Sequence, residues 1–244
     1  MKITVSWLSA GVSSFIATYL MKDKADEIYY IDIEDQDEDS IRFIKDCEKV
    51  LKKEVKILKS PYKNVENAIK AFGGIRNANT HFYPCTAWLK KRVRKEQFED
   101  LHKNDEITYI WGFDCSERKR AERLLESMPQ YKHVFPLIEN NLTKEDCHAI
   151  LKRLGFKRPK MYDLGYKNNN CIGCVKGGAG YWNKIKKDFP EVFQKRAMLE
   201  RELGVSILKD CYLDELAPNQ GIFEKEIPEE CGIFCELVLG LNWR

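Results

Sequence analysis

Two closely spaced cysteines, Cys171 and Cys174, precede a glycine-rich turn that contains Lys176. Two thiols at this spacing can bind a metal ion or form a reversible disulfide. The neighbouring glycines carry no side chain, so they let the backbone approach a ligand closely. We therefore expect chemistry in residues 163–182 before any other part of the chain.

Further cysteines, Cys85, Cys231 and Cys235, stand at predicted turns beside proline or glycine. Because the sequence shows no secretory signal, thiol or metal chemistry is expected rather than a disulfide framework. Thiolates favour zinc or an iron–sulfur cluster, usually with about four protein ligands. Two ligand sets remain open. One combines Cys171, Cys174, Cys231 and Cys235 as in a zinc knuckle, and the other combines Cys85, Cys171 and Cys174 with a further donor or an open position.

A possible phosphate-binding turn follows the first apolar stretch, residues 3–8. A helix is expected from residue 15, and the turn before it consists of Ser9, Ala10, Gly11, Val12, Ser13 and Ser14. Unpaired backbone N–H groups and the helix dipole both favour an anion at such a turn. We expect the phosphates of a nucleotide to bind here, with help from Arg120.

Asp32 stands at the end of the second predicted strand, residues 27–33. Its carboxylate could accept a hydrogen bond from a ribose or adenine group of the same nucleotide. It could equally cap a helix or a loop.

Strand and helix patterns alternate over most of the chain. Strands are expected at residues 3–8, 27–33, 55–58, 107–113 and 133–138, with helices between them. This alternation predicts an α/β fold with a doubly wound, mostly parallel sheet, whose ligands bind at the carboxyl edge of the strands. Residues 1–156 would form the nucleotide-binding domain. Residues 157–244, with the Cys-x-x-C loop, a helix and a Cys-rich C-terminal extension, would pack on the same domain.

The composition argues against a membrane protein. Hydrophobic residues make up 43% of the chain, and no apolar run is long enough to span a bilayer. The N-terminus does not resemble a signal peptide, so a cytoplasmic location is expected. Basic and acidic residues nearly balance, 41 against 38, which does not favour a general polyanion-binding surface. Basic clusters at residues 90–95 and 118–123 are either solvated helix faces or cationic walls for phosphates or a nucleic acid.

Several segments, in the same order along the chain, resemble the phosphoadenosine phosphosulfate (PAPS) or adenosine phosphosulfate (APS) reductases. This family lies within the PP-loop ATP pyrophosphatases and adenine nucleotide α-hydrolase-like proteins. The similar segments are residues 9–14, Cys85-Thr86, Trp111-Gly112-Phe113-Asp114 with Glu117 and Arg120, Tyr162 to Tyr166, and Glu230-Cys231-Gly232-Ile233.

This resemblance implies an adenine nucleotide substrate, either PAPS, APS or ATP. It implies phosphate contacts from residues 9–14, Gly112 and Arg120, and an iron–sulfur cluster, or zinc, on Cys85, Cys171 and Cys174. Cys231, with Cys235 nearby, would act as the sulfur nucleophile. A thiol protein would supply electrons or sulfur. The sequence departs from the ATP pyrophosphatase loop where Ala10 replaces a glycine and Ser13 an aspartate.

Two alternatives are consistent with the same residues. The chain could be a PP-loop ATP-dependent sulfurtransferase that modifies a nucleic acid held by the two basic clusters. It could also be a non-catalytic nucleotide-binding protein with a structural zinc, an interpretation that the altered loop favours.

Overall fold

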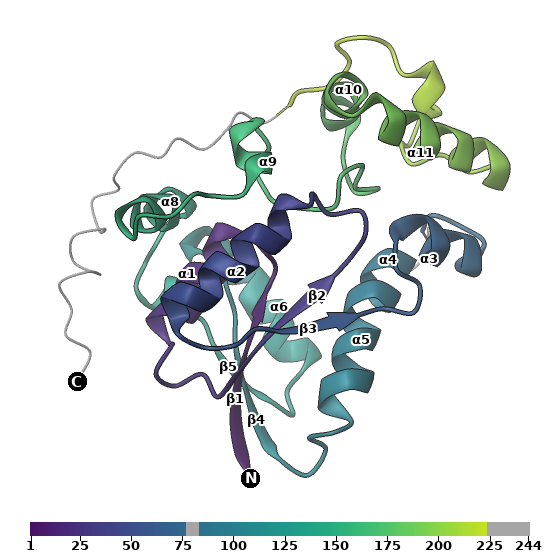
Figure 1. Ribbon diagram of the computed structural model, residues 1–244. Coiled ribbons are helices and arrows are strands. Elements are labelled where there is room, and N and C mark those ends of the chain that lie inside the picture. The colour runs from purple at the N-terminus through teal and green to yellow at the C-terminus, as the bar shows by residue number, and fades with distance from the viewer. Residues whose placement is uncertain (77–82, 224–244) are drawn as a thin grey trace.

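A computed structural model describes residues 1–76 and 83–223 of the chain (Figure 1). Cys231 and Cys235 lie outside this part. Five strands form one parallel sheet in the order β3-β2-β1-β4-β5. The strands are β1 (Lys2–Leu8), β2 (Glu27–Asp32), β3 (Lys56–Lys59), β4 (Glu106–Ile110) and β5 (Lys132–Val134). The predicted α/β fold with a parallel sheet is confirmed.

The order in which strands are added to the sheet changes direction at β1. It proceeds outward from β1 to β2 and β3, and then returns to place β4 on the other side of β1. Connections on the two sides of such a point leave on opposite faces, so a crevice opens at the carboxyl ends of the two strands. The turn after β1 and the segment after β4 therefore meet at one place.

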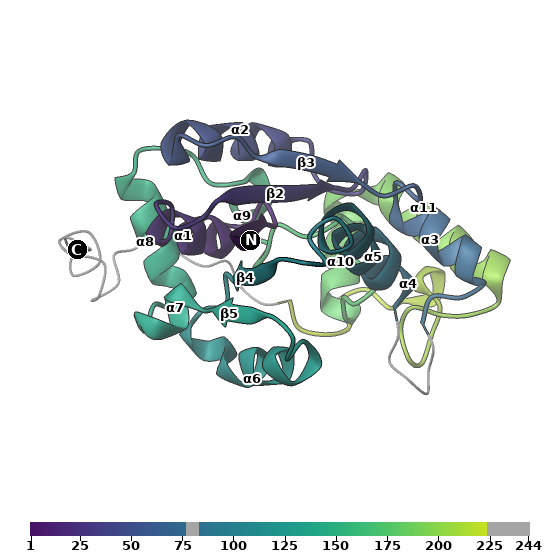
Figure 2. The same cartoon turned by 90° about the horizontal axis from the view of Figure 1, so that it is seen from below.

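Helices cover both faces of the sheet. On one face lie α1 (Val12–Leu20), α2 (Asp39–Leu51) and α8 (Lys144–Arg153), whose Phe15, Phe43 and Ile150 are fully buried. On the other face lie α6 (Arg118–Ser127) and a continuous helical stretch, which packs Phe98 against Tyr109. In Figure 2, α1 and α8 lie on one side of the sheet and α5 on the opposite side. The stretch consists of α4 (Pro84–Thr86), a π-helical turn (Ala87–Lys91), α5 (Arg92–Arg94) and a second π-helical turn (Lys95–Glu99).

A second hydrophobic core lies beyond the carboxyl ends of the strands. It contains Ile69, Trp182 and Phe193, and packs α3 (Val65–Phe72) with α10 (Ala179–Asp188) and α11 (Pro190–Leu203). Figure 1 shows α10 and α11 above the sheet. The remaining helices are α7 (Pro136–Glu139), α9 (Lys160–Asp163) and two 3-10 turns (Cys115–Glu117 and Leu213–Glu215).

The sequence prediction made two strands, β4 and β5, longer than they are in the structure. β4 ends at Ile110 rather than residue 113, because Gly112 turns toward α1 and Asp114 caps the following helical turn. β5 ends at Val134 rather than residue 138, because Pro136 lacks the N–H that a strand would donate and begins α7 instead. At the start of α8, Thr143 and Asp146 form a capping box.

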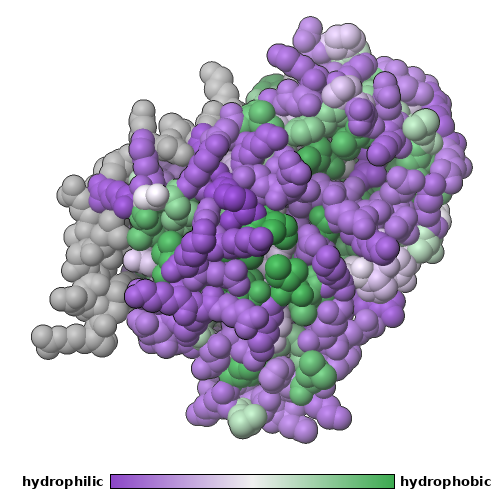
Figure 3. All heavy atoms as spheres, in the orientation of Figure 1, coloured by the Kyte–Doolittle hydropathy of each residue, from purple (hydrophilic) through white to green (hydrophobic). Residues whose placement is uncertain are grey.

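The face in Figure 3 is mostly hydrophilic, with hydrophobic side chains in small groups. Within residues 1–76 and 83–223, no helix has the length and apolar character needed to cross a bilayer.

His148 of α8 is a buried histidine whose burial should make the stability of the core depend on pH. It is 1% exposed and packs edge-on against the Tyr162 ring, with 4.6 Å between centroids. Burial, reinforced by nearby Arg158 and Lys144, lowers the pKa of His148 to about 4. The unfolded chain therefore binds a proton at His148 more readily than the folded chain does. The contribution of neutral His148 to the free energy of unfolding is complete above about pH 6.5 and is lost as the pH falls toward 4.

We expect His148→Phe to weaken this acid sensitivity. Between pH 7 and pH 4, the free energy of unfolding of wild type should fall by about 3 kcal/mol more than that of the variant. Urea denaturation at the two pH values measures the difference. If the free energies of unfolding of wild type and His148→Phe changed equally between the two pH values, the imidazole of His148 would not be buried in its neutral form.

Candidate nucleotide and thiol site

The turn after β1 has a fixed local structure. Ala10 adopts the left-handed conformation, with φ of 55°. The Ser14 hydroxyl donates to the Gly11 carbonyl at 2.8 Å and accepts from the Ser9 N–H at 3.1 Å. The first turn of α1 then begins at Val12, and such a turn leaves N–H groups without intrahelical partners. We call residues 9–14 the phosphate loop. Its hydrogen bonds fix a turn at the N-terminus of α1, where the helix dipole is positive.

The members of the phosphate loop differ in what they can offer a ligand. Ser9 and Ser14 line a cleft. Ala10 and Val12 are buried at 1% and 0% exposure, so only their backbone groups are available. The Ser13 hydroxyl is also buried, beside the thiol of Cys147. Ser13 therefore does not present a side chain in the way that an aspartate at the same position could.

Gly112, just after β4, lies directly against the phosphate loop. A Cβ atom added to Gly112 would lie 2.5 Å from the Ser14 Cα and 2.7 Å from the Ser14 nitrogen. Any side chain would collide with backbone here. The absence of a side chain brings the two sides of the crevice into contact.

The cleft between these segments has a volume of about 310 Å³. We call it the switch-point cleft because it lies where the sheet changes direction. It brings together Ser9 and Ser14 of the phosphate loop, Gly112 and Arg120, as the sequence predicts, with the aromatic rings of Trp7 and Trp111. The helical stretch 84–99 adds three cations, which are Lys90, Lys91 and Arg94.

Neighbouring groups orient the guanidinium groups of the cleft. Arg120 stacks 4.2 Å from the centroid of the Phe113 ring and forms a 2.5 Å ion pair with Glu117. Arg94 forms a 2.9 Å ion pair with Glu99. Charged guanidinium donors suit the oxygen atoms of phosphate or sulfate.

Asp32 does not line the switch-point cleft. It stands at the carboxyl end of β2, where its carboxylate pairs with Lys59 at 3.3 Å. Its predicted contact with a ribose or adenine group stays a prediction. The neighbouring Ile31 and Gln36 line the cleft instead.

The Cys-x-x-C turn is held by a tyrosine of α10. The Tyr181 hydroxyl accepts from the Cys174 N–H at 3.0 Å and donates to the Cys171 carbonyl at 3.3 Å. Gly173 between them has φ of +69°. The turn borders a second cavity of about 490 Å³, lined also by Lys176. We call this second space the cysteine-side cavity.

Burial and neighbouring charges shift the pKa values of the thiols of Cys85 and Cys171. Burial raises the pKa of Cys171 to about 12, and Lys90 of the cleft opposes the rise. Burial and the nearby Cys174 also raise the pKa of Cys85, while Lys176 and Lys90 act in the opposite direction. Protonated thiols of this kind react only when a base, a cation or a substrate stabilises the thiolate.

The described residues do not support the predicted metal site. Across 1–76 and 83–223, no three His, Cys, Asp or Glu side chains gather in a way that could hold a metal ion. Cys85, Cys171 and Cys174 are neighbours without forming such a group. The iron–sulfur and zinc hypotheses remain predictions.

The sequence profile of the phosphoadenosine phosphosulfate reductase domain matches residues 3–180. The chain belongs to this family. Members of the PAPS reductase family are enzymes that act on adenine nucleotide substrates in sulfur metabolism. The matched part contains the phosphate loop, Gly112, Arg120, Cys85 and the Cys-x-x-C turn.

A solved structure is also similar to this PAPS reductase family chain. It is phosphoadenylyl-sulfate (PAPS) reductase from Candida auris in a phosphate complex, with 14% identity and a TM-score of 0.49. The similarity covers 70% of this chain and 82% of the other. No protein with a curated description matches the chain.

The sequence could not show two residues that hold the phosphate loop, Tyr162 and Asn169. The Tyr162 hydroxyl accepts from the Val12 N–H at 3.3 Å, and the Asn169 amide donates to the Ala10 carbonyl at 2.8 Å. The sequence drew attention to Tyr162 only through its family resemblance. Asn169 stands in a run of polar residues that carries no comparable signal.

Proposed function

We propose that the chain binds an adenine phosphosulfate, PAPS or APS, in the switch-point cleft and reduces its sulfur with cysteine thiols. One observation carries the proposal. Ser9 and Ser14 of the phosphate loop, Gly112, Arg120 and Lys90 line a single cleft in a chain of the PAPS reductase family. The phosphates would accept hydrogen bonds from the first turn of α1, while the cations would offset the charge of the ligand.

The thiol chemistry would take place beside this cleft. Reduction of a phosphosulfate requires a thiolate that attacks sulfur and displaces the nucleotide phosphate. A second thiol then releases sulfite and leaves a disulfide. Lys90 acts on Cys85 and Cys171 and also lines the cleft, which supports thiol chemistry near a bound nucleotide. Cys231 stays our predicted nucleophile, with Cys235 nearby, although both lie outside the described residues.

The direct test is release of sulfite from PAPS and from APS in the presence of a dithiol reductant. We expect wild type to release sulfite from one of them and Cys231→Ser to release none, because serine cannot form the sulfur–sulfur bond. Cys47→Ser is a matched control, since Cys47 is buried in α2 and is absent from the cleft. Equal activity of Cys231→Ser and wild type would contradict the proposed nucleophile.

The basic clusters do not favour the sulfurtransferase alternative. Arg92 pairs with Glu96 and Lys95 with Asp100. Acidic partners thus interrupt the cluster at residues 90–95. Binding of a nucleic acid therefore stays a prediction of the sequence.

Charge reversal in the switch-point cleft should weaken nucleotide binding. Lys90→Glu removes a cation and adds a repulsive charge, so we expect the affinity for adenosine 3′,5′-bisphosphate to fall roughly 10- to 100-fold. Lys45→Glu makes the same charge change on an exposed position of α2 and should shift the affinity by less than about twofold. Isothermal titration calorimetry measures both. If both variants lost the same affinity, the net charge of the protein would explain the loss, and a specific contact between Lys90 and the nucleotide would be contradicted.

A further inference from the structure

Asn169, in the loop before the Cys-x-x-C turn, is buried at 5% exposure and contacts the phosphate loop. Its Nδ2 group donates to the Ala10 carbonyl at 2.8 Å and to the Ser40 hydroxyl oxygen at 3.0 Å. Because a carbonyl can only accept, the amide nitrogen must face Ala10. Asn169 therefore joins the phosphate loop to the start of α2.

The contact falls on the strained residue of the loop. A non-glycine residue with φ near +55° is disfavoured by roughly 1 kcal/mol or more, so surrounding contacts must hold it. The Ala10 carbonyl and the Gly11 N–H belong to one planar trans peptide and point in opposite directions. A donor that fixes the carbonyl thus also fixes the direction of the Gly11 N–H, away from Asn169.

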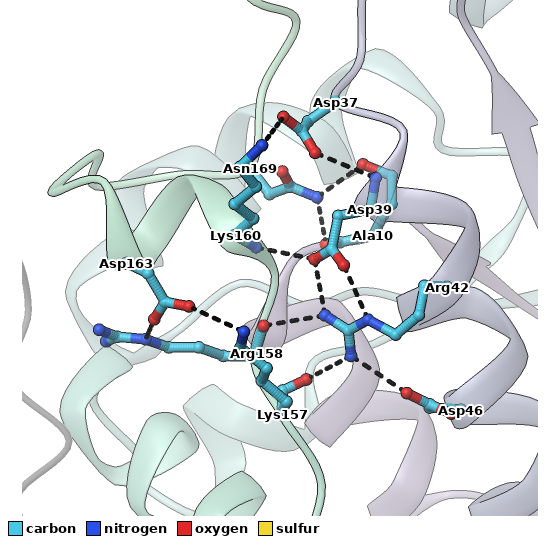
Figure 4. A network of polar contacts seen from close by, with 11 residues as sticks. Ala10, Asp37, Asp39, Arg42, Asp46, Lys157, Arg158, Lys160, Asp163 and Asn169 are labelled. Carbon is cyan, nitrogen blue, oxygen red and sulfur yellow. Dashed lines mark hydrogen bonds and ion pairs between the residues drawn. The ribbon is translucent and has the colours of Figure 1, made fainter. Parts of the chain in front are cut away.

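A polar network in turn fixes the segment that carries Asn169 (Figure 4). Arg42 of α2 donates to the carbonyls of Lys157 and Arg158 at 2.7 and 3.0 Å. Asp39 accepts from the Lys160 N–H at 2.8 Å and pairs with Arg42 at 2.6 Å. Side chains at the start of α2 therefore hold the backbone that leads to Asn169.

Tyr162, in the same segment, makes a second contact with the phosphate loop. Its hydroxyl accepts from the Val12 N–H at 3.3 Å. Burial raises the pKa of Tyr162 to about 12, while hydrogen bonds from the backbone of Val12 and Asn169 oppose the rise. The hydroxyl is therefore neutral at physiological pH. The same segment thus holds the loop at two consecutive peptide groups.

We infer that Asn169 is a positioning residue, supported by Tyr162, that sets the direction of the Gly11 N–H of the phosphate loop toward a bound phosphate. The inference rests on the proposed function, because it assumes that the loop binds the phosphates of a nucleotide. Asn169 itself does not line the switch-point cleft, so it acts through the loop rather than on the ligand.

The test compares a ligand with phosphates and a ligand without them. The first is whichever of AMP, adenosine 3′,5′-bisphosphate and ATP wild type binds most tightly, and the second is adenosine. Asn169→Ala should weaken binding of the nucleotide roughly tenfold and leave the affinity for adenosine unchanged. Asn170→Ala, an exposed neighbour in the same loop, is the control and should change neither. Calorimetry and competition titrations supply the affinities.

Amide hydrogen exchange of residues 9–14 without ligand gives a second measurement. We expect faster exchange there in Asn169→Ala than in wild type or Asn170→Ala. If Asn169→Ala does not fold, Tyr162→Phe decides the question, because it removes only the hydroxyl and should show the same selective loss.

The outcomes separate this inference from the proposed function. If wild type binds no adenine nucleotide, the proposed function fails and the inference fails with it. If wild type binds a nucleotide and Asn169→Ala binds it equally well, only the inference is overturned. An equal loss of affinity for adenosine and for the nucleotide would also overturn it, because that result would show general damage to the site.

Discussion

Replacing Gly112 with alanine should have the largest effect on the switch-point cleft. The new methyl group would lie 2.5 Å from the Ser14 Cα, so the phosphate loop and the segment after β4 must move apart. We expect the free energy of unfolding to fall by about 2–3 kcal/mol, as for an overpacked core. Affinity for adenosine 3′,5′-bisphosphate should fall more than about tenfold, because Ser14 belongs to the loop that must hold the phosphate.

Gly178→Ala is the matched control for this variant. Gly178 has φ of −82°, and a Cβ atom there would meet nothing within 4 Å. Because Gly178 is the N-cap of α10, the free energy of unfolding should fall by less than about 1 kcal/mol, and the nucleotide affinity should equal that of wild type. Urea denaturation and calorimetry measure both properties. A Gly112→Ala protein with wild-type affinity would show that close contact at Ser14 is not needed for binding.

Replacing Arg196 with methionine should have the largest effect on stability. Arg196 of α11 is 3% exposed and forms a short ion pair with Asp35, whose other oxygen accepts from the Val65 N–H at 2.6 Å. The substitution leaves the largely buried Asp35 carboxylate, 13% exposed, without its cation. We expect a loss of about 3–5 kcal/mol in the free energy of unfolding.

The same variant should loosen the Cys-x-x-C turn. Asp35 accepts from the Ile172 N–H through its carbonyl, and Arg196 contacts the Gly173 carbonyl. Cys171, now 9% exposed, should therefore be alkylated faster by iodoacetamide. Arg201→Met is the control on the same helix. Its ion pair with Asp214 is solvent-exposed, so its loss should cost less than about 1 kcal/mol. Similar losses for both arginines would contradict this difference.

Local patterns in the sequence predicted most of the fold. The apolar run of β1, the small residues after it and the capping residue Thr143 all act on neighbouring residues, so their effects are visible in the chain. β4 and β5 were predicted too long for a different reason. Gly112 leaves the sheet to meet Ser14, and this contact joins residues 98 positions apart.

The sequence also predicted some, but not all, of the residues of the candidate site. Ser9, Ser14, Gly112 and Arg120 line one cleft, as the family resemblance implies. Asp32 pairs with Lys59 on the neighbouring strand, because the register of β2 and β3 brings these two side chains together, and its contact with a nucleotide stays a prediction. The support from Asn169 depends on a contact across 159 residues, which no local pattern reveals.

The most direct test of the central claim is a crystal structure of the chain with adenosine 3′,5′-bisphosphate. We predict that a phosphate of the ligand accepts hydrogen bonds from N–H groups of residues 9–14, with Lys90 and Arg120 on either side of the ligand. A nucleotide bound in the cysteine-side cavity, with the phosphate loop empty, would contradict the account.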